Sequence, residues 1–239
     1  MSAPHSAEPE KVQALFTRIA GGYDRFNGIA SWGLDRGWRK RAVRLAAIAD
    51  GARVLDLAAG TGDLTAALAE QAAPALVVSS DFTAAMLVAG KAKLDKLPDA
   101  KARQRITFSL ADATRLPFAD GSFDAVTVSF GLRNFADRPA NYREVRRVLK
   151  PGGRYVVLEL THPGFAPFKP VYWLYVRKVL PLFGARIAGD RAAYEYLHDS
   201  IQAFPDATAL AAELAAHGFS KVEFEKLSFG IVAIHVATK

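Results

Sequence analysis

The chain contains no cysteine among its 239 residues. Thiolates serve as metal ligands, redox couples and nucleophiles, so this absence excludes disulfides, iron–sulfur clusters and cysteine-dependent catalysis. Long apolar runs are also missing. The most hydrophobic stretch, 171–183, is interrupted by Arg177, Lys178 and Pro181, and it falls short of the roughly 20 apolar residues that span a bilayer. We therefore expect no membrane-spanning helix, and we predict no metal site.

The composition is that of an ordinary globular protein, with 51% hydrophobic and 23% charged residues. This balance supplies a sizeable core and excludes a disordered chain. The first eleven residues are polar and have no apolar segment after a basic start, so we expect no secretory signal and a cytoplasmic location. The net charge of +7 favours anionic partners, either nucleic acid or a membrane surface, although a solvated basic surface explains any single Lys or Arg equally well.

Short apolar segments alternate with helical patterns from residue 53 onward. The predicted strands are 53–58, 75–80, 106–110, 124–130 and 154–160. Such alternation is typical of a parallel sheet with helices on both faces. Two further strands, 221–227 and 230–238, are joined by a short connection and predict a closing antiparallel hairpin. We therefore predict an α/β fold with a mostly parallel, seven-stranded, Rossmann-like sheet.

The whole chain, 1–239, is predicted to be one domain with four parts. The parts are N-terminal helices at 1–49, a ligand-binding core at 50–163, an insertion at 164–207, and a C-terminal helix with the hairpin at 208–239. The alternation stops in the insertion, where aromatic residues mix with Lys and Arg. We expect this segment to cover the sheet.

A glycine-rich turn follows the first predicted strand. Gly60 and Gly62 permit a sharp turn and a close approach of the backbone to a ligand, and ligands of open α/β sheets bind beyond the carboxyl ends of the strands. Asp81 ends the second strand, 19 residues after Gly62, near the spacing at which a carboxylate binds a ribose diol. Together these residues predict a nucleoside site. A tight strand-to-helix connection is the structural alternative for the glycines alone.

The form of the loop distinguishes between nucleoside cofactors. A dinucleotide site would carry a third glycine where this chain has Thr65. The pattern instead suits a ligand without phosphate, S-adenosyl-L-methionine. Asp112 and Ala113, after the third strand, then lie where the adenine edge would be read. A helix N-cap is the structural alternative for Asp112.

Several longer motifs carry a family resemblance. They are Tyr23-Asp24, Asp56-Leu-Ala-Ala-Gly-Thr-Gly-Asp-Leu-Thr65, Leu116-Pro-Phe118, Ser129-Phe-Gly-Leu-Arg-Asn-Phe135 and Leu149-Lys-Pro-Gly-Gly153. Together they resemble the class I methyltransferases that C-methylate the quinone ring in menaquinone and ubiquinone biosynthesis, and the resemblance covers nearly the whole chain. It implies a class I methyltransferase fold, S-adenosyl-L-methionine as cofactor and a polyprenylated quinol as substrate.

The resemblance also implies which residues contact the cofactor. These are Thr61, Asp81, Asp112, Ala113 and Ser129. We add Gly60 and Gly62 from the loop, and Tyr23 from the family motif. Ala58 departs from the wider class I pattern, where a glycine is usual, but the quinone family resembles this chain in having alanine there.

Arg133 and Asn134 follow the fourth strand, at the edge where the acceptor would lie. A quinol ring carbon becomes nucleophilic when the adjacent hydroxyl, with a pKa around 10 by analogy with tyrosine, loses its proton. A guanidinium stabilises such a phenolate and an amide orients it, so we predict catalytic roles for both residues. The structural alternative is an ion pair between Arg133 and Asp137, with Asn134 capping the next helix.

A general base is harder to find. His162, just past the fifth strand, and His198, in the insertion, are candidates for accepting the phenolic proton. Water held by Arg133 is a third hypothesis. His5, His217 and His235 are interpreted as tail, helix-end and strand residues.

The acceptor implied by the resemblance carries a polyprenyl tail, and such a tail resides in a membrane. We expect the insertion to cover the acceptor site, and its aromatic and basic segment 165–191 is a candidate surface for peripheral membrane contact. Core packing of the same aromatics is the alternative. A basic helix could contribute to this surface through Arg36, Arg39, Lys40, Arg41 and Arg44.

An RNA methyltransferase and a non-catalytic binding module are the rival functions. Methylation of cytosine C5 uses a cysteine nucleophile, and methylation of exocyclic amines uses an Asn/Asp-Pro-Pro-aromatic loop where this chain has Ser129-Phe-Gly-Leu132. We therefore expect no nucleic acid partner, and the intact Gly60, Gly62 and Asp81 count against a binding module. Within the resemblance, demethylmenaquinol is the expected acceptor, and the ubiquinone precursor 2-polyprenyl-6-methoxy-1,4-benzoquinol is the alternative. It leaves tail length and oligomeric state open.

Overall fold

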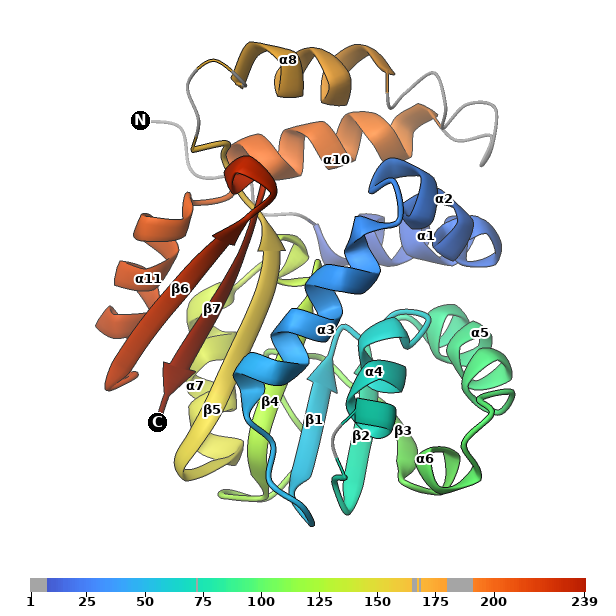
Figure 1. Cartoon of the computed structure of the whole chain (residues 1–239), viewed down its shortest axis with the longest axis vertical. Coiled ribbons are helices and arrows are strands. Elements are labelled where there is room, and N and C mark those ends of the chain that lie inside the picture. The colour runs from blue at the N-terminus through green and yellow to red at the C-terminus, as the bar shows by residue number, and fades with distance from the viewer. Residues whose placement is uncertain (1–7, 72, 165–166, 168, 180–190) are drawn as a thin grey trace.

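The computed structural model describes residues 8–239 except 72, 165–166, 168 and 180–190 (Figure 1). Seven strands form a sheet in the order β3-β2-β1-β4-β5-β7-β6. Their bounds are β1 Arg53–Leu57, β2 Leu76–Asp81, β3 Ile106–Leu110, β4 Phe123–Ser129, β5 Leu149–Leu160, β6 Lys221–Leu227 and β7 Val232–Thr238. Neighbours among β1 to β5 pair in parallel, and β7 pairs antiparallel with both β5 and β6. The predicted mostly parallel sheet with a closing hairpin is confirmed.

The helices of the described chain follow the predicted alternation. Their bounds are α1 Pro9–Ile19, η1 Ala20–Gly22, α2 Tyr23–Ala30, α3 Leu34–Ala46, α4 Asp63–Gln71, α5 Ala84–Leu94, α6 Ala100–Gln104, η2 Leu132–Asn134, α7 Arg138–Val148, α8 Lys169–Leu174, the π-helical η4 Tyr175–Val179, α10 Arg191–Ala203, α11 Ala207–Ala216 and η5 Ser228–Gly230. Three of the described helices, α6, α7 and α11, begin at aspartate caps: Asp99 accepts a hydrogen bond from Lys101 N, Asp137 accepts one from Ala140 N, and Asp206 accepts one from Ala209 N.

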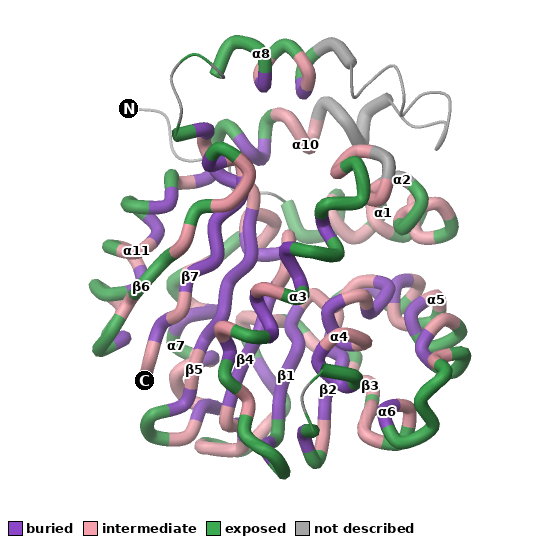
Figure 2. Tube along the Cα trace, viewed as in Figure 1, coloured by how far each residue is buried: buried purple, intermediate pink, exposed green. Residues whose placement is uncertain are grey.

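The inner strands β1, β2, β4, β5 and β7 are buried on both faces because helices cover each side of the sheet (Figure 2). The edge strands β3 and β6 are partly exposed. Side chains of a strand alternate between faces. Val54 therefore packs with Leu68 under α3 and α4, whereas its neighbour Leu55 packs with Val145 of α7 and Leu214 of α11 on the other side. Buried parallel strands of this kind appear in the sequence as short apolar runs.

One strand begins earlier than predicted. The sequence Lys150-Pro-Gly-Gly153 predicts a turn before the fifth strand, but β5 extends back to Leu149. The register against β4 shifts there, between the pairs Phe123–Leu149 and Ala125–Arg154, and Gly152 has a φ of 75°. The predicted turn is therefore an irregularity inside a longer strand.

The carboxyl ends of β1, β4 and β5 point toward α1, α2, α8 and α10, which lie beyond that edge of the sheet (Figure 1). A satellite core of Tyr172, Val176 and Ile201 joins α8, η4 and α10, and Ala30 of α2 packs against it. The insertion thus covers the edge at which ligands of such sheets bind. In the part of the chain that the structure describes, no helix is both long and apolar enough to cross a membrane.

Candidate active site

The glycine loop after β1 and the end of β2 are joined by a carboxylate. Gly60 N donates to Asp81 Oδ2 at 2.8 Å, and Thr83 N donates to Asp81 Oδ1 at 2.7 Å. Burial raises the pKa of Asp81, against these two backbone hydrogen bonds that lower it. Each carboxylate oxygen has a second lone pair, so Asp81 can hold the loop and still accept hydrogen bonds from a ligand.

The glycines of the loop are required for different reasons. Gly62 has a φ of 82°, and a Cβ added there would lie 2.6 Å from Leu94 Cδ1, so its freedom serves packing against α5. Gly90 of α5 is the counterpart, because a Cβ there would lie 3.1 Å from the carbonyl oxygen of Gly60. At Gly60 itself, with a φ of 56°, the nearest heavy atom to an added Cβ is Tyr23 Cε1 at 3.7 Å. Gly60 is therefore the loop position with room beside it, and the sequence interpretation that placed Gly62 at the ligand misses its contact with Leu94.

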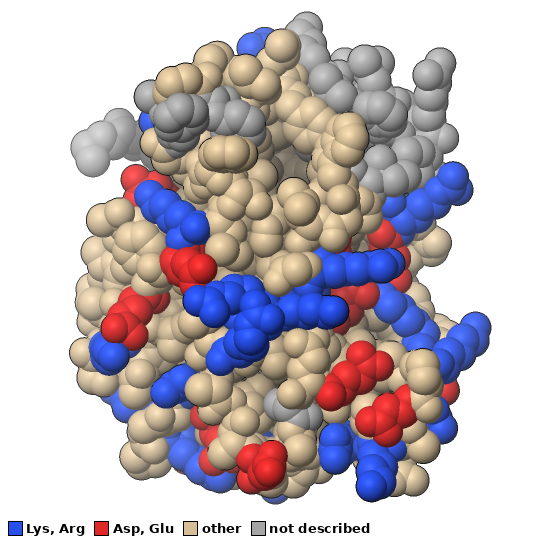
Figure 3. All heavy atoms as spheres, viewed as in Figure 1, with Lys and Arg blue, Asp and Glu red and all other residues tan. Residues whose placement is uncertain are grey.

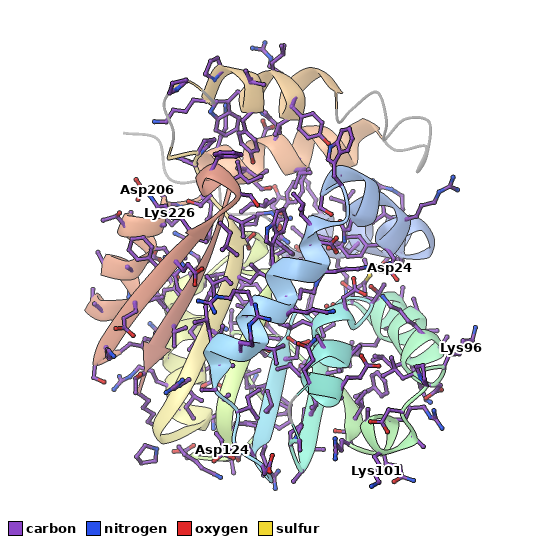
Figure 4. All side chains as sticks on the ribbon, in the orientation of Figure 1. Asp24, Lys96, Lys101, Asp124, Asp206 and Lys226 are labelled. Atoms are coloured by element: carbon purple, nitrogen blue, oxygen red, sulfur yellow. The ribbon has the colours of Figure 1, made fainter. Side chains whose placement is uncertain are left out.

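A hydrogen bond and a series of ion pairs connect the N-terminal helices to this loop. The hydroxyl of Thr61 donates to Asp24, which Figure 4 shows between the N-terminal helices and α5. Lys93 Nζ lies 2.6 Å from Asp24 Oδ2 and also pairs with Asp63. Arg39 Nη2 is 3.5 Å from Asp63 Oδ2. The motif Tyr23-Asp24, singled out from the sequence, thus docks α2 on the glycine loop.

The ends of β3 and β4 complete the same edge. The carboxylate of Asp112 accepts from the backbone and hydroxyl of Thr114, at 2.8 Å each. No helix of the described chain begins there, so the N-cap alternative for Asp112 is wrong. Ala113 O accepts from Asn141 Nδ2 at 2.9 Å, and Ser129 is the last residue of β4.

This donor and acceptor set fits S-adenosyl-L-methionine. Asp81 supplies carboxylate lone pairs for a ribose diol, and the exposed Asp112 supplies them for the exocyclic amine of adenine. The left-handed Gly60 leaves room for close approach of a ligand to the backbone. The ligand itself has no phosphate, and the loop retains Thr65, not glycine, at the third position that a pyrophosphate would need.

Arg133 is held by a buried carboxylate from β5. Its Nη1 lies 2.7 Å from Glu159 Oε1, and the two side chains are 7% and 1% exposed. The backbone N of Arg133 also donates to Glu159 Oε2 at 3.2 Å. Burial lowers the pKa of Arg133, but the charge and hydrogen bond of Glu159, together with Tyr23 and Tyr196, outweigh this effect and raise the pKa. The guanidinium is therefore fixed in place as a cation.

The structural alternatives for Arg133 and Asn134 are wrong. Arg133 pairs with Glu159 and not with Asp137, which instead caps α7 through Ala140 N at 2.8 Å. Asn134 caps no helix. Its Oδ1 accepts a hydrogen bond from the hydroxyl of Tyr196, on the insertion helix α10, at 2.9 Å.

A cavity of about 390 Å³ lies between the N-terminal helices, the end of β4 and the insertion. Its walls are mostly apolar and aromatic, and include Phe16, Trp38, Phe130, Tyr172 and Leu197. Tyr23, Arg133 and Tyr196 line it as well. Ligand sites of this volume typically combine apolar walls with a few polar groups that orient the ligand. Since Tyr23 also faces Gly60, the cavity adjoins the glycine loop.

A family model described as the ubiE/COQ5 methyltransferase family matches residues 5–239. The chain belongs to this family. Membership confirms the resemblance inferred from the motifs, the predicted enzyme class and S-adenosyl-L-methionine as the methyl donor.

Individual relatives cover nearly the full chain. A protein named demethylmenaquinone methyltransferase from Thermus thermophilus is 48% identical over 94% of this chain and 100% of its own length. One named ubiquinone/menaquinone biosynthesis C-methyltransferase UbiE, from Geotalea uraniireducens, is 40% identical over 96% and 97%. Among solved structures, a SAM-dependent methyltransferase from Thermotoga maritima superposes with a TM-score of 0.64 at 16% identity, over 95% of this chain and 98% of that chain. That likeness shows the class I fold that was predicted.

The sequence did not reveal three residues of this methyltransferase site. Glu159 lies in the apolar strand 154–160, where a single acidic residue was its only signal. Tyr196 belongs to an insertion whose helical register could not be assigned. Asp35 is buried, accepts from Ser31 at 2.7 Å and pairs with Arg39 in the cavity wall; no motif pointed to it.

The histidines do not supply a base to the cavity. His162 Nε2 contacts Ile201 O at 3.1 Å, and His198 Nδ1 contacts Asp199 at 3.0 Å. Neither ring is among the described side chains that line the cavity. His235 and His217 are strand and helix-end residues as predicted, and His5 lies outside the described residues.

Proposed function

We propose that this methyltransferase transfers a methyl group to a ring carbon of a polyprenylated quinol, with demethylmenaquinol as the acceptor. The names of the relatives support this choice of substrate. The ubiquinone precursor is the second candidate, because one close relative is named for both pathways.

A single observation carries the proposal: an aromatic-lined cavity of about 390 Å³ meets a buried arginine at its wall. The volume and the apolar walls suit a flat ring with the beginning of a prenyl chain. Arg133 places a cation in the wall of this otherwise mostly apolar cavity, and a ligand that stayed neutral would not require one. The combination matches an apolar acceptor that becomes an anion during the reaction.

The chemistry follows from the acceptor. Bound S-adenosyl-L-methionine supplies an electrophilic methyl group on a sulfonium. The quinol hydroxyl releases its proton, the ring carbon forms a bond to the methyl carbon as the carbon–sulfur bond breaks, and the hydrogen of that ring carbon restores the hydroxyl, so that one proton is released overall. Arg133 stabilises the phenolate, and the cavity excludes water and holds the ring in line with the methyl group.

We assign the site residues accordingly. Arg133 and Asn134 act on the acceptor. The cofactor is held by Gly60, Thr61, Gly62, Asp81, Asp112, Ala113, Ser129 and Tyr23. Asp81 and Asp112 are proposed to bind directly. Gly62 and Thr61 contribute by shaping the loop, because their contacts are with Leu94 and Asp24.

A peripheral membrane contact at the inner face of the cytoplasmic membrane is part of this proposal, because the acceptor's tail resides in lipid. Trp32, 81% exposed, Leu34 and Val171 are exposed apolar residues that also line the cavity, and Leu174 is exposed on the same helix as Val171. Of the segment 165–191 that we predicted to contact the membrane, residues 165–166, 168 and 180–190 lie outside the described residues, and Tyr172 is buried. In the described part of this segment the proposal therefore rests on Val171 and Leu174. We expect the Trp32→Ser variant to sediment less with vesicles of anionic phospholipid, and Val88→Ser, which removes a similarly exposed apolar residue on α5, to sediment like the parent.

The basic helix contributes less charge than its sequence suggests. Arg39 is buried against Asp35, and Arg41 pairs with Glu225 at 2.8 Å. Arg36, Lys40 and Arg44 are exposed. Figure 3 shows a band of Lys and Arg across the middle of this face of the molecule, below a region whose described atoms are mostly uncharged. The band can contact anionic headgroups while apolar residues enter the interface.

The decisive experiment uses a host that lacks its own quinone C-methyltransferase and expresses this chain. Mass spectrometry of the extracted quinones should show methylated menaquinone appear and its demethyl precursor disappear. Conversion of the ubiquinone precursor instead would select the second candidate. Accumulation of both precursors, with the protein present and folded, would contradict the proposed function.

A further inference from the structure

The insertion places the phenol of Tyr196 against the residues that follow β4. Tyr196, on α10, donates its hydroxyl hydrogen to Asn134 Oδ1 at 2.9 Å. Helix α10 lies beyond the carboxyl edge of the sheet (Figure 1). Its ring lines the same cavity as Arg133. A residue 62 positions away in sequence therefore completes the polar wall made by the segment after β4.

The hydrogen bond to Asn134 leaves the phenol oxygen with unused accepting capacity. A phenol hydroxyl has one hydrogen, which Tyr196 donates to Asn134, and two lone pairs that can accept hydrogen bonds. Burial raises the pKa of Tyr196, and the nearby charge of Arg133 lowers it less. Tyr196 is therefore a neutral phenol near pH 7, able to receive a hydrogen bond but not to act as the base.

The acceptor has the complementary group. A quinol hydroxyl that has not yet ionised is a hydrogen-bond donor, and in a cavity with mostly apolar walls an unpaired donor is costly. The guanidinium of Arg133 has only hydrogen-bond donors, so it cannot accept a hydrogen bond from the hydroxyl of the quinol. Asn134 Oδ1 receives the hydrogen of Tyr196, and Tyr196, unlike Asn134, is among the described residues that line the cavity.

We propose that the oxygen of Tyr196 accepts a hydrogen bond from the acceptor hydroxyl beside the ring carbon to be methylated, and so positions that carbon. This inference rests on the proposed quinol substrate. The contact selects acceptors by a hydroxyl and not by the prenyl tail. It also holds the hydroxyl beside Arg133 before ionisation, and it makes the insertion part of the binding site as well as its cover.

Tyr155 offers a matched control. Its hydroxyl donates to Asn141 Oδ1 at 3.0 Å, the same pairing of phenol and amide, but it is buried in the core beneath α7. Tyr155→Phe and Tyr196→Phe thus each remove one hydroxyl from one hydrogen bond to an asparagine. Only the second variant changes the cavity wall.

The test measures binding with S-adenosylhomocysteine present, so that no turnover occurs. The probes are 2-prenylnaphthalene-1,4-diol, kept reduced under anaerobic conditions, and the analogue that lacks the hydroxyl beside the unsubstituted carbon of the quinol ring. Calorimetry should show the parent and Tyr155→Phe binding the diol about ten- to a hundredfold more tightly than the analogue. Tyr196→Phe should bind the two within about threefold of each other, because the hydroxyl and its partner form one interaction.

The outcomes separate the two proposals. If Tyr196→Phe discriminates between the ligands as the parent does, the assignment of Tyr196 is overturned even if the parent methylates quinols. If Tyr155→Phe loses discrimination to the same extent, the effect is structural and the assignment is again overturned. If the parent neither binds nor methylates the diol or the benzoquinol precursor, the proposed function fails and this inference fails with it.

Discussion

Arg133 and Glu159 form a buried salt bridge at 2.7 Å, between the segment after β4 and the end of the neighbouring strand β5. The pair is placed where the cavity meets the carboxyl edge of the sheet. The carboxylate of Glu159 accepts two hydrogen bonds from Arg133, one from Nη1 of its guanidinium and one from its backbone N. The cation is thus oriented before any acceptor binds, which is the arrangement that stabilises developing negative charge best.

Arg133→Lys should reduce turnover far more than it weakens cofactor binding. Lysine retains the charge but loses the planar fork that holds both Glu159 and a phenolate. We expect kcat to fall about a hundred- to a thousandfold, as for loss of one donor to a developing anion. Raising the pH should partly restore it, because more quinol ionises unaided. Arg138→Lys, which alters the outer pair with Glu213, is the control. Near-normal turnover, or a defect confined to cofactor affinity, would remove Arg133 from the mechanism.

Glu159→Gln should destabilise the protein as well as slow it. The substitution leaves Arg133 as a buried cation without its partner, a change that typically costs about 3–5 kcal/mol. Urea unfolding should show a loss of that order. Glu213→Gln removes the partner of Arg138 from a more exposed pair, with side chains 26% and 21% exposed, and should cost much less. Equal losses for the two variants would mean that burial of the Arg133 pair is not what makes it important.

Asp81→Ala should weaken binding of S-adenosyl-L-methionine by about ten- to more than a hundredfold, since a hydrogen bond to a charged group is lost. Because Asp81 also accepts hydrogen bonds from Gly60 N and Thr83 N, the substitution should also lower the stability of the fold. Asp206→Ala is the control, as it likewise removes a carboxylate that receives a backbone N–H, at the start of α11. Calorimetry should find cofactor affinity unchanged in the control. An unchanged affinity in Asp81→Ala would refute direct binding.

Gly131→Ala should destabilise the fold, and Ala58→Gly should rescue it. A Cβ at residue 131 would lie 2.6 Å from the Cβ of Ala58, which itself has a φ of 47°. Overpacking of this kind costs about 1–3 kcal/mol. The double variant removes this clash and leaves a tight contact of 3.2 Å with Val128 Cγ2, so we expect most of the loss to be recovered. Glycine also tolerates the left-handed conformation at position 58 better than alanine. Denaturant midpoints of the four proteins give the coupling. Purely additive effects would show that the two positions do not compete for space.

The stability of the protein should carry a pH signature of Asp56. Burial raises the pKa of this carboxyl from 3.8 to about 6, although Thr65 and Thr127 donate to it. The folded state therefore holds a proton between pH 4 and 6 that the unfolded state has released. Stability from this group falls as pH rises through that window, by about 3 kcal/mol in total, and is level above it. Asp81, with a pKa raised in the same direction, adds to the fall.

The Asp56→Asn variant isolates this effect. His235, whose pKa burial lowers to about 4, works in the opposite direction over nearly the same range, so the parent's profile alone is not diagnostic. The difference in unfolding free energy between Asp56→Asn and the parent should grow from pH 4 to pH 6 in favour of the variant, and then stay constant. A difference independent of pH would show that Asp56 titrates at its ordinary value.

The sheet, the glycine loop and the family could be predicted from the sequence alone. Buried parallel strands appear as short, mostly apolar runs, and the turn after β1 requires residues that tolerate positive φ. The strand 53–58 and the glycines at 60 and 62 can therefore be recognised from local sequence. Asp81 was likewise predictable, because the carboxyl ends of adjacent parallel strands meet at one edge and a residue that ends a strand can be placed there from its position alone.

The side chains that pair with Arg133 and Asn134 could be identified only from the tertiary structure. Glu159 is separated from Arg133 by 26 residues and Tyr196 from Asn134 by 62, and no local pattern specifies which side chains two distant segments bring together. Asp137 and Glu159 both carry a carboxylate that can pair with the guanidinium of Arg133. The pairing of β4 with β5 placed only Glu159 beside it, while Asp137 was committed to the N-terminus of α7. Local spacing can therefore predict which residues reach the edge of the sheet, but the packing of strands and helices decides which of them meet.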